Sequence, residues 1–361
     1  MGGAWIPSVR QFWRKGDAMP FSVWQHAFVR GHRLSARRLG QMFRLRYSSV
    51  QGEVLKGYRP HEPELDPPFE VIEPSRLVSP LVFSSPHSGN IYPRRFLASA
   101  RLDEAALRRS EDSFVDELFA GVTALGAPLI KARFPRVYLD LNREPYELDP
   151  SMFEGALPPF ANTRSLRVAA GLGTIARIAT QAQQIYARPL PVAEALERID
   201  KLYKPYHACL GKLIERARRL FGAAVLVDCH SMPSVMRRPG HLPLFADLTP
   251  AGRADFIIGD RFGASCGTDL VDAVEGELRR RGYLVHRNKP YAGGHITEHY
   301  GKPALECHAM QIEVSRARYM DEGGLRKSDY FASIAHDLTK AASVLAEAAA
   351  QRSNRLKPAA E

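Results

Sequence analysis

Short apolar runs alternate with longer stretches of helical periodicity along most of this chain, and two of the runs end alike. LVFSSPHSG at residues 81–89 and AAVLVDCHSMP at residues 223–233 each lead from apolar strand residues to a histidine followed by serine. Proline and glycine end a strand sharply, so we expect His87 and His230 on turns just past two strand ends. Ligands bind at that edge of the sheet in α/β proteins. The pattern therefore predicts that the two histidines meet at one binding edge.

The remainder of the chain from about residue 69 also alternates strands with helices, which is typical of an α/β domain. Asp103 is the expected N-cap of the first long helix, Gly126 its stop, and Pro205 should kink the second. A long loop is predicted over residues 147–173. Predicted helices cover residues 102–126, 191–221, 268–281 and the segment from Ser328 onward, and predicted strands cover 128–133, 137–141, 223–228, 254–259, 283–287 and 308–315.

A proline-rich acidic segment at residues 60–68 reads as a linker. We therefore expect residues 1–68 to form a basic, poorly ordered extension and linker. Residues 69–345 should form the folded domain, and residues 346–361 a fraying, alanine-rich tail. Removal of residues 1–60 is expected to leave folding and turnover intact.

The net charge of +11 is concentrated in this extension. Residues 1–59 carry eleven Lys/Arg and two acids, a balance of +9, which leaves +2 for residues 60–361. The main domain is therefore not expected to bind nucleic acid. The extension, with a candidate amphipathic helix at residues 23–45, is either dispensable upstream sequence or an arm for a membrane surface or an acidic partner.

The four cysteines lie far apart and form no CxxC pair, so neither a disulfide framework nor a thiolate zinc site is expected. This suits a reducing cytosol. The chain has no apolar run of about 18 residues and no apolar core of a secretory signal at its N-terminus. We therefore expect a cytoplasmic protein without a transmembrane helix.

His87 and His230 would supply two of the three protein ligands of a hydrolytic zinc site, which keeps a fourth position for water. Asp112 is a carboxylate that a helix beside the sheet can present as the third ligand. The alternatives are that each histidine is a structural hydrogen-bonding group and that Asp112 is a solvated helix acid.

Glu313 stands in a strand otherwise built of apolar residues, where a carboxylate is costly unless it is paired or functional. It is a candidate general base that takes a proton from a zinc-bound water. The alternative is a salt bridge to Arg316 or Arg318.

Arg136, Asn142 and Arg143 flank the predicted strand at residues 137–141, within the stretch RVYLDLNR at residues 136–143. Two arginines and an asparagine suit the bidentate capture of a carboxylate. The alternatives are a surface arginine pair or a structural Asp–Arg bridge.

Five motifs occur in order along the chain: SPHSG at 85–89, RVYLDLNR at 136–143, DCHSMP at 228–233, NKPYAGG at 288–294 and QIEVSRARYMDE at 311–322. Together these motifs resemble the N-formylglutamate amidohydrolase family, a distant relative of the zinc carboxypeptidases. The resemblance runs in order over residues 70–345 and does not include residues 1–60. It implies one α/β/α domain with a mixed central sheet, one zinc per chain held by His87, Asp112 and His230, and Glu313 as the base.

The resemblance also implies that Asn142 and Arg143 bind a substrate carboxylate. At GGHITEH, residues 293–299, an aromatic residue is expected after the glycines and a basic one after the threonine, so this loop departs from the family pattern. We take His295 and Thr297 as candidate substrate contacts in it.

The resulting hypothesis is zinc-dependent hydrolysis of a small-molecule N-acyl acidic amino acid, with N-formyl-L-glutamate, giving formate and L-glutamate, as the best single substrate. Arg136 and the zinc would stabilise the tetrahedral oxyanion, while Arg143 holds a substrate carboxylate. The alternatives are a deacylase or carboxypeptidase-like enzyme acting on other N-acyl amino acids or small peptides, and a catalytically silent metal-binding scaffold.

Overall fold

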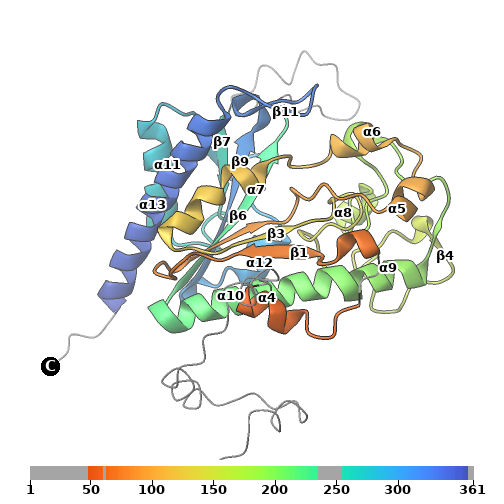
Figure 1. The fold of residues 1–361 in the computed structure, drawn as a ribbon, viewed down its shortest axis with the longest axis horizontal. Helices are drawn as coiled ribbons and strands as arrows, with labels where there is room; N and C mark the ends of the chain where they lie inside the picture. Colours follow the sequence, from red (N-terminus) through yellow and green to blue (C-terminus); the bar gives the residue numbers. More distant parts are fainter. Residues whose placement is uncertain (1–47, 60–61, 235–253, 357–361) are drawn as a thin grey trace, which may run out of the picture. The chain divides into compact units, whose positions relative to one another are not determined.

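A mixed seven-stranded sheet forms the centre of the computed structural model, which describes residues 48–59, 62–234 and 254–356 (Figure 1). The strand order is β1-β3-β2-β6-β9-β7-β8. Strands β3, β2, β6 and β9 are parallel, β1 and β7 run antiparallel to β3 and β9, and β8 is parallel to β7. The strands are β1 Phe69–Ile72, β2 Leu81–Ser85, β3 Leu129–Ala132, β6 Ala224–Met232, β7 Phe256–Gly259, β8 Val285–Arg287 and β9 Cys307–Ser315.

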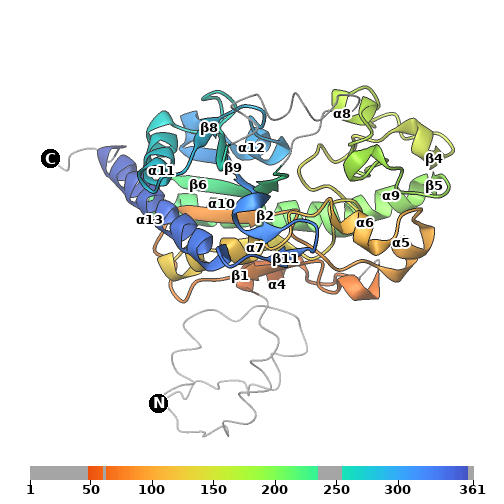
Figure 2. The same ribbon diagram turned by 90° about the horizontal axis from the view of Figure 1, so that it is seen from above.

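Helices cover both faces of this sheet (Figure 2), which confirms the predicted α/β class and its mixed sheet. One core lies under α4 Ser49–Val54, α9 Val192–Arg198, α10 Lys204–Phe221 and α12 His295–Tyr300. The other lies under α7 Val115–Leu118, α11 Thr268–Arg280 and α13 Phe331–Leu356. Val82 belongs to the first core, while Leu81 and Phe83 belong to the second. Because β2 is buried on both sides, its sequence is a continuous apolar run without polar alternation.

The long helical region predicted at residues 191–221 is one helix with an irregular centre. A five-residue π-helical segment, Ile199–Tyr203, joins α9 to α10 just before Pro205. Smaller elements complete the fold: α5 Arg94–Ser99, α6 Glu104–Arg108, α8 Leu166–Ala169, β4 Phe153–Glu154, β5 Leu190–Pro191, β10 Met320–Asp321 and β11 Arg326–Lys327, with 3₁₀ turns at Pro63–Leu65, Ala120–Leu125, Pro150–Met152, Thr180–Ala182, Pro303–Leu305 and Arg316–Arg318.

Two predicted elements are wrong. The helix expected over residues 102–126 is three short pieces, although it begins with Asp103 as N-cap and stops at Gly126, as predicted. It breaks at Phe114, whose φ of 65° is left-handed, because the backbone there turns inward and Asp112 N donates to His87 O at 3.0 Å. The strand expected over residues 137–141 is an irregular segment. Its apolar side chains are buried in the core, which explains why the pattern suggested a strand.

The folded domain begins before the predicted linker. Gln51 of α4 is buried, and its amide accepts from Val71 N (2.9 Å) and donates to Phe69 O (2.6 Å). Since β1 is an edge strand, Gln51 pairs backbone groups that would otherwise be free for another chain. The candidate helix at residues 23–45 lies outside the described residues.

At the other end, α13 continues to Leu356, beyond the expected boundary at residue 345, and Arg352 donates to Glu306 and Asp269. All four cysteines are free. Among the described residues, no helix combines the length and the apolar character needed to cross a membrane.

Truncation can separate the contribution of α4 from that of the preceding residues. Removing residues 1–47 keeps α4, whereas removing residues 1–60 deletes it together with both hydrogen bonds of Gln51. We expect the 61–361 chain to lose on the order of 1–3 kcal/mol of unfolding free energy relative to the 48–361 chain, because buried β1 groups lose their partners. Chemical denaturation followed by circular dichroism gives both values. Equal stabilities would show that α4 does not support the domain.

Candidate metal centre

The structure brings His87, Asp112 and His230 together in a buried cluster. Their ligand atoms lie within 4.8 Å of one another, a spacing at which one metal ion can be held. His87 follows β2 by two residues, as the sequence predicts. His230 lies within β6, which continues to Met232, and not on a turn past residue 228 as expected. Asp112 comes from the break between α6 and α7.

Each histidine is held at Nε2 by a further carboxylate. Asp140 Oδ1 lies 2.7 Å from His87 Nε2, and Asp228 Oδ2 lies 2.9 Å from His230 Nε2. Because an ionised carboxylate accepts hydrogen bonds, Nε2 is the nitrogen that keeps its proton in each ring, which leaves Nδ1 as the nitrogen that can bind a cation. The Nδ1 atoms of His230 and His87 lie 3.0 and 3.5 Å from Asp112 Oδ2. Both Nδ1 atoms therefore face Asp112: Nδ1 of His230 donates to this carboxylate, and the buried Nδ1 of His87 has no hydrogen-bond partner among the described residues.

The charges of the cluster favour a cation. Burial raises the pKa of Asp112, but contacts with His230, His87 and Arg136 outweigh burial and hold this pKa well below its usual value. Burial lowers the pKa of His230, but Asp228 and Asp112 outweigh burial and raise this pKa well above its usual value. Asp112 thus stays ionised, and positive charge is stabilised beside it.

Arg316, just after β9, fixes the segment that carries Asp112. Its Nη2 donates to Asp112 Oδ1 (3.2 Å) and to Glu111 O, and its Nη1 donates to Arg109 O (3.1 Å). Arg318 pairs with Asp255. Neither arginine therefore forms the alternative salt bridge to the carboxylate of β9 that the sequence left open.

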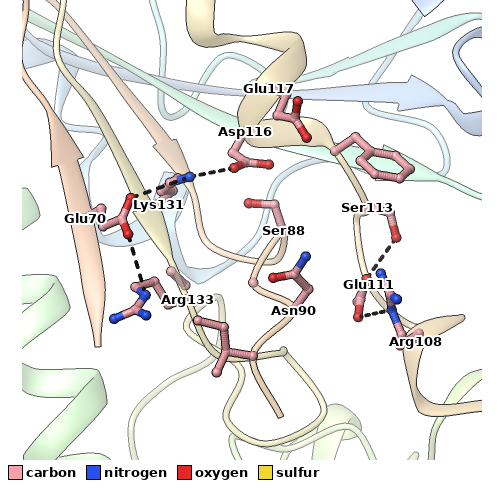
Figure 3. Close-up of a pocket in the computed structure, with 14 residues that line it drawn as sticks. Glu70, Ser88, Asn90, Arg108, Glu111, Ser113, Asp116, Glu117, Lys131 and Arg133 are labelled. Atoms are coloured by element: carbon pink, nitrogen blue, oxygen red, sulfur yellow. Dashed lines mark hydrogen bonds and ion pairs between the residues drawn. The ribbon is translucent and has the colours of Figure 1, made fainter. Parts of the chain in front are cut away.

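A cavity of about 330 Å³ lies beside the segments that carry His87 and Asp112, and Figure 3 shows its lining. Glu111, next to Asp112, accepts from Ser113 Oγ (3.0 Å) and Arg108 Nε (3.2 Å). On the opposite wall, Lys131 Nζ lies 3.0 Å from Asp116 Oδ2. These charges pair with one another. The lining of this cavity does not include His87, Asp112 or His230, so the cavity is separate from the histidine cluster.

Glu313 lies beside the cluster, because it is the direct register partner of His230 across β6 and β9. Its side chain is 6% exposed, and Gln311 Nε2 donates to its Oε1 at 2.7 Å. Burial raises the pKa of Glu313 to about 7, with Asp112 adding to the rise and His230 opposing it. A carboxylate with a pKa near the working pH is suited to general base catalysis.

Arg136 and Arg143 lie on either side of Asp140. Arg136 Nη2 donates to Asp140 Oδ2 at 2.9 Å, and Arg136 Nη1 lies 4.0 Å from Asp112 Oδ1. Arg143 Nη2 lies 3.6 Å from the same Asp140 oxygen. The structural Asp–Arg bridge that the sequence left open is therefore present, and it brings both guanidinium groups to the metal cluster.

The irregular segment that carries these arginines is held from the side of α9 and α10. The side chains involved all bond to its backbone carbonyls: Arg198 Nη1 to Tyr138 O (3.1 Å), His207 Nε2 to Leu141 O (2.9 Å) and Tyr203 Oη to Arg143 O (2.7 Å). Arg143 itself donates from Nε to Leu172 O at 2.8 Å. These bonds fix a segment that has no strand partner.

Asn142 has its hydrogen-bonding groups engaged inside the fold. Its Nδ2 donates to Asp228 Oδ2 (2.9 Å), and its Oδ1 accepts from Ile296 N (2.8 Å). The side chain is buried and supports His230 through Asp228, which leaves little of it for a substrate.

The two candidate substrate contacts on the glycine loop, His295 and Thr297, differ in burial. Thr297 is fully buried, and its hydroxyl donates to Gly294 O at 2.8 Å, so it stabilises the first turn of α12. His295 is half-buried, with its ring 6.0 Å from that of His207 and 5.4 Å from that of His299. Of the two, His295 is the side chain with exposed surface.

Sequence reasoning did not assign the supporting residues Asp140, Asp228, Gln311 and Arg316 to the site. Asp228 and Gln311 each stand two positions before a functional residue on the same strand. Because side chains two apart share one face of a strand, this spacing is a usable signal. Asp140 gave no such signal, because it approaches His87 through an irregular segment.

Comparisons with known proteins show the family of this chain. The family model described as N-formylglutamate amidohydrolase matches residues 79–320. The N-formylglutamate deformylase of Pseudomonas putida is 30% identical over 247 residues, which cover 67% of this chain and 82% of that protein. The protein of the same name from Pseudomonas aeruginosa is 31% identical over 258 residues, which cover 70% of this chain and 86% of that protein.

Solved structures extend the similarity to the fold. The crystal structure of N-formylglutamate amidohydrolase from Ralstonia eutropha JMP134 aligns with a TM-score of 0.72 and 38% identity, covering 79% of this chain and 99% of that one. A gene product of Agrobacterium tumefaciens has the same fold, with a TM-score of 0.53 and 19% identity over 79% of this chain and 95% of that one. The family match spans more than half of the chain, and the chain therefore belongs to the N-formylglutamate amidohydrolase family, a family of amide-hydrolysing enzymes.

Proposed function

We propose that this amidohydrolase hydrolyses N-formyl-L-glutamate to formate and L-glutamate with one zinc ion bound by His87, Asp112 and His230. The observation that carries the proposal is the pair of imidazoles whose Nε2 atoms are held by carboxylates while both Nδ1 atoms face Asp112. The names of the curated relatives support the substrate.

The donor set fits zinc. Two imidazole nitrogens and one carboxylate are a ligand set of hydrolytic zinc sites, and carboxylates that hold the distal imidazole nitrogens are their usual second layer. The buried Nδ1 of His87 lacks a hydrogen-bond partner among the described residues and could instead coordinate the ion. A bound zinc ion supplies acidification of water and polarisation of the amide carbonyl.

The chain supplies the proton transfers and the charge complementarity. Glu313 accepts a proton from the attacking water and returns it to the leaving amine. Arg136 lies beside Asp112 and places a cation where the amide oxygen gains negative charge. Arg143 has N–H groups beyond those given to backbone carbonyls and offers them to a substrate carboxylate. His295 is the candidate contact from the glycine loop.

Metal content tests the ligand assignment directly. We expect about one zinc per chain, with loss of the metal in His87→Ala and His230→Ala and weaker binding in Asp112→Asn, because three ligands are needed to hold the ion. His336→Ala, which changes an exposed histidine of α13, is the matched control and should keep its zinc. Elemental analysis of the purified variants gives the result. Full zinc retention in both ligand variants would refute the site.

Glu313→Gln separates binding from proton transfer, because it keeps the shape of the side chain and removes the base. We expect kcat to fall 10²–10⁴-fold with zinc retained. In the parent enzyme kcat should fall at acid pH, because the Glu313 carboxylate takes up a proton there. Burial raises its pKa to about 7 and a bound cation would lower that value, so the fall should lie below pH 7. Steady-state kinetics across pH measure both effects. A fully active Glu313→Gln enzyme contradicts this role.

A substrate panel tests the preference for an acidic substrate and the role of Arg143 in binding its carboxylate. Among N-formyl and N-acetyl derivatives of Glu, Asp, Gln and His, N-formylglutamate should have the highest kcat/KM. Arg143→Lys keeps the charge but loses the planar guanidinium group that can donate two parallel hydrogen bonds to a carboxylate. The interaction with N-formylglutamate should therefore weaken by about 1.5–3 kcal/mol, and the interaction with the derivative whose α-carboxylate is capped as an amide by much less. Unfolding free energy should also fall, because Arg143 donates to Leu172 O and Asn142 O. Equal losses for both substrates would make Arg143 a structural residue.

A further inference from the structure

Two side-chain amides connect the glycine loop at residues 293–296 to the reacting groups. Gln311 of β9 donates from Nε2 to Glu313 Oε1 at 2.7 Å and accepts at Oε1 from Gly294 N at 3.0 Å. Asn142 connects Ile296 N to Asp228, which holds His230. The loop that precedes α12 is therefore tied both to the candidate base and to a candidate metal ligand.

The strand register explains why Gln311 can make this bridge. Gln311 and Glu313 are two residues apart on β9, so their side chains lie on the same face. In the neighbouring β6, Asp228 and His230 are their direct partners. Each strand thus presents a functional residue and, two positions earlier, the residue that holds it.

The glycine loop packs closely against the site, which restricts the Gln311 side chain that joins Gly294 to Glu313. Gly294 lies against the Asn142 amide, and a Cβ on Gly294 would come within 2.4 Å of Asn142 Oδ1. Gln311 is 5% exposed, so each of its bonds forms in a largely dry environment where a lost partner is costly. Among the described residues, Gln311 is the one side chain that hydrogen-bonds to the Glu313 carboxylate.

We propose that Gln311 is a positioning residue that fixes the Glu313 carboxylate and the Gly294 loop relative to each other. This inference rests on the proposed role of Glu313 as the base. With Oε1 held by the Gln311 amide, Oε2 is the oxygen that faces the water and takes its proton. The same amide sets the position of the loop that carries His295, so it couples the placement of the substrate to the placement of the base.

Two substitutions of Gln311 separate its hydrogen bond to Glu313 from its hydrogen bond to Gly294. Gln311→Glu keeps an acceptor for Gly294 N and replaces the amide donor to Glu313 by a second carboxyl group, which raises the pKa of Glu313, whereas Gln311→Met loses both hydrogen bonds. We expect kcat to fall on the order of ten- to a hundredfold in both, the range for a hydrogen bond to a charged group. KM for N-formylglutamate should stay within about twofold in Gln311→Glu and rise severalfold in Gln311→Met. Zinc content, measured by elemental analysis, should be unchanged in both.

His308→Leu is the matched control, because it removes a buried hydrogen-bonding side chain from the same strand. Its ring contacts Gly267 N and Glu306, which lie outside the site. Both kcat and KM of this variant should stay within about twofold of the parent. A loss in His308→Leu equal to that in Gln311→Met would mean that β9 responds to any buried polar deletion, and the inference would be overturned.

Combination with Glu313→Gln separates positioning from general structural damage. If Gln311 acts through Glu313, neither Gln311 variant should lower the residual kcat of Glu313→Gln by more than about twofold. A further tenfold loss in that background would overturn the role of Gln311 while leaving the proposed function intact. An active Glu313→Gln single variant would instead overturn the base assignment and, with it, this inference.

Discussion

The repulsion among four buried carboxylates is the constraint on which the site depends. Asp112, Asp140, Asp228 and Glu313 are each at most 6% exposed, and a buried charge is expensive unless it is paired. Three arginines supply part of the balance: Arg136 and Arg143 beside Asp140, and Arg316 on Asp112. Within the described part of the chain, neither Asp228 nor Glu313 has an arginine partner at ion-pair distance. The protonated ring of His230, whose pKa Asp228 and Asp112 raise, supplies the further positive charge, and a bound cation would take the place of its Nδ1 proton.

Topology brings these charges together from distant parts of the sequence. Strands β2, β6 and β9 are adjacent and parallel, so their carboxyl ends meet at one edge of the sheet. His87, His230 and Glu313 come from these three strands in order. The helices on both faces keep the strands buried, and the irregular segments between elements supply Asp112 and Asp140.

The strand-borne part of the site was predictable from the sequence, and the loop-borne part was less so. The histidines of SPHSG and DCHSMP could be placed at a shared edge because buried strands have a recognisable apolar pattern. Residues 137–141 have the same apolar character for another reason, since they are an irregular segment buried in the core. Apolar content reports burial and does not by itself report backbone conformation. The helix predicted over residues 102–126 failed likewise, because its break at Phe114 serves a tertiary contact.

The π-helical segment at residues 199–203 sets the rotational phase of α10 relative to α9. Arg198, Tyr203 and His207 all bond to the segment at residues 138–143, although they are spaced five and then four residues apart. In an uninterrupted α-helix one residue turns the chain by about 100°, so Arg198 would share its face with residue 202 instead of Tyr203. The wider turn absorbs that extra residue. A one-residue insertion in a helix thus lets three side chains from both sides of the irregularity follow one line along the backbone that carries Asp140 and Arg143.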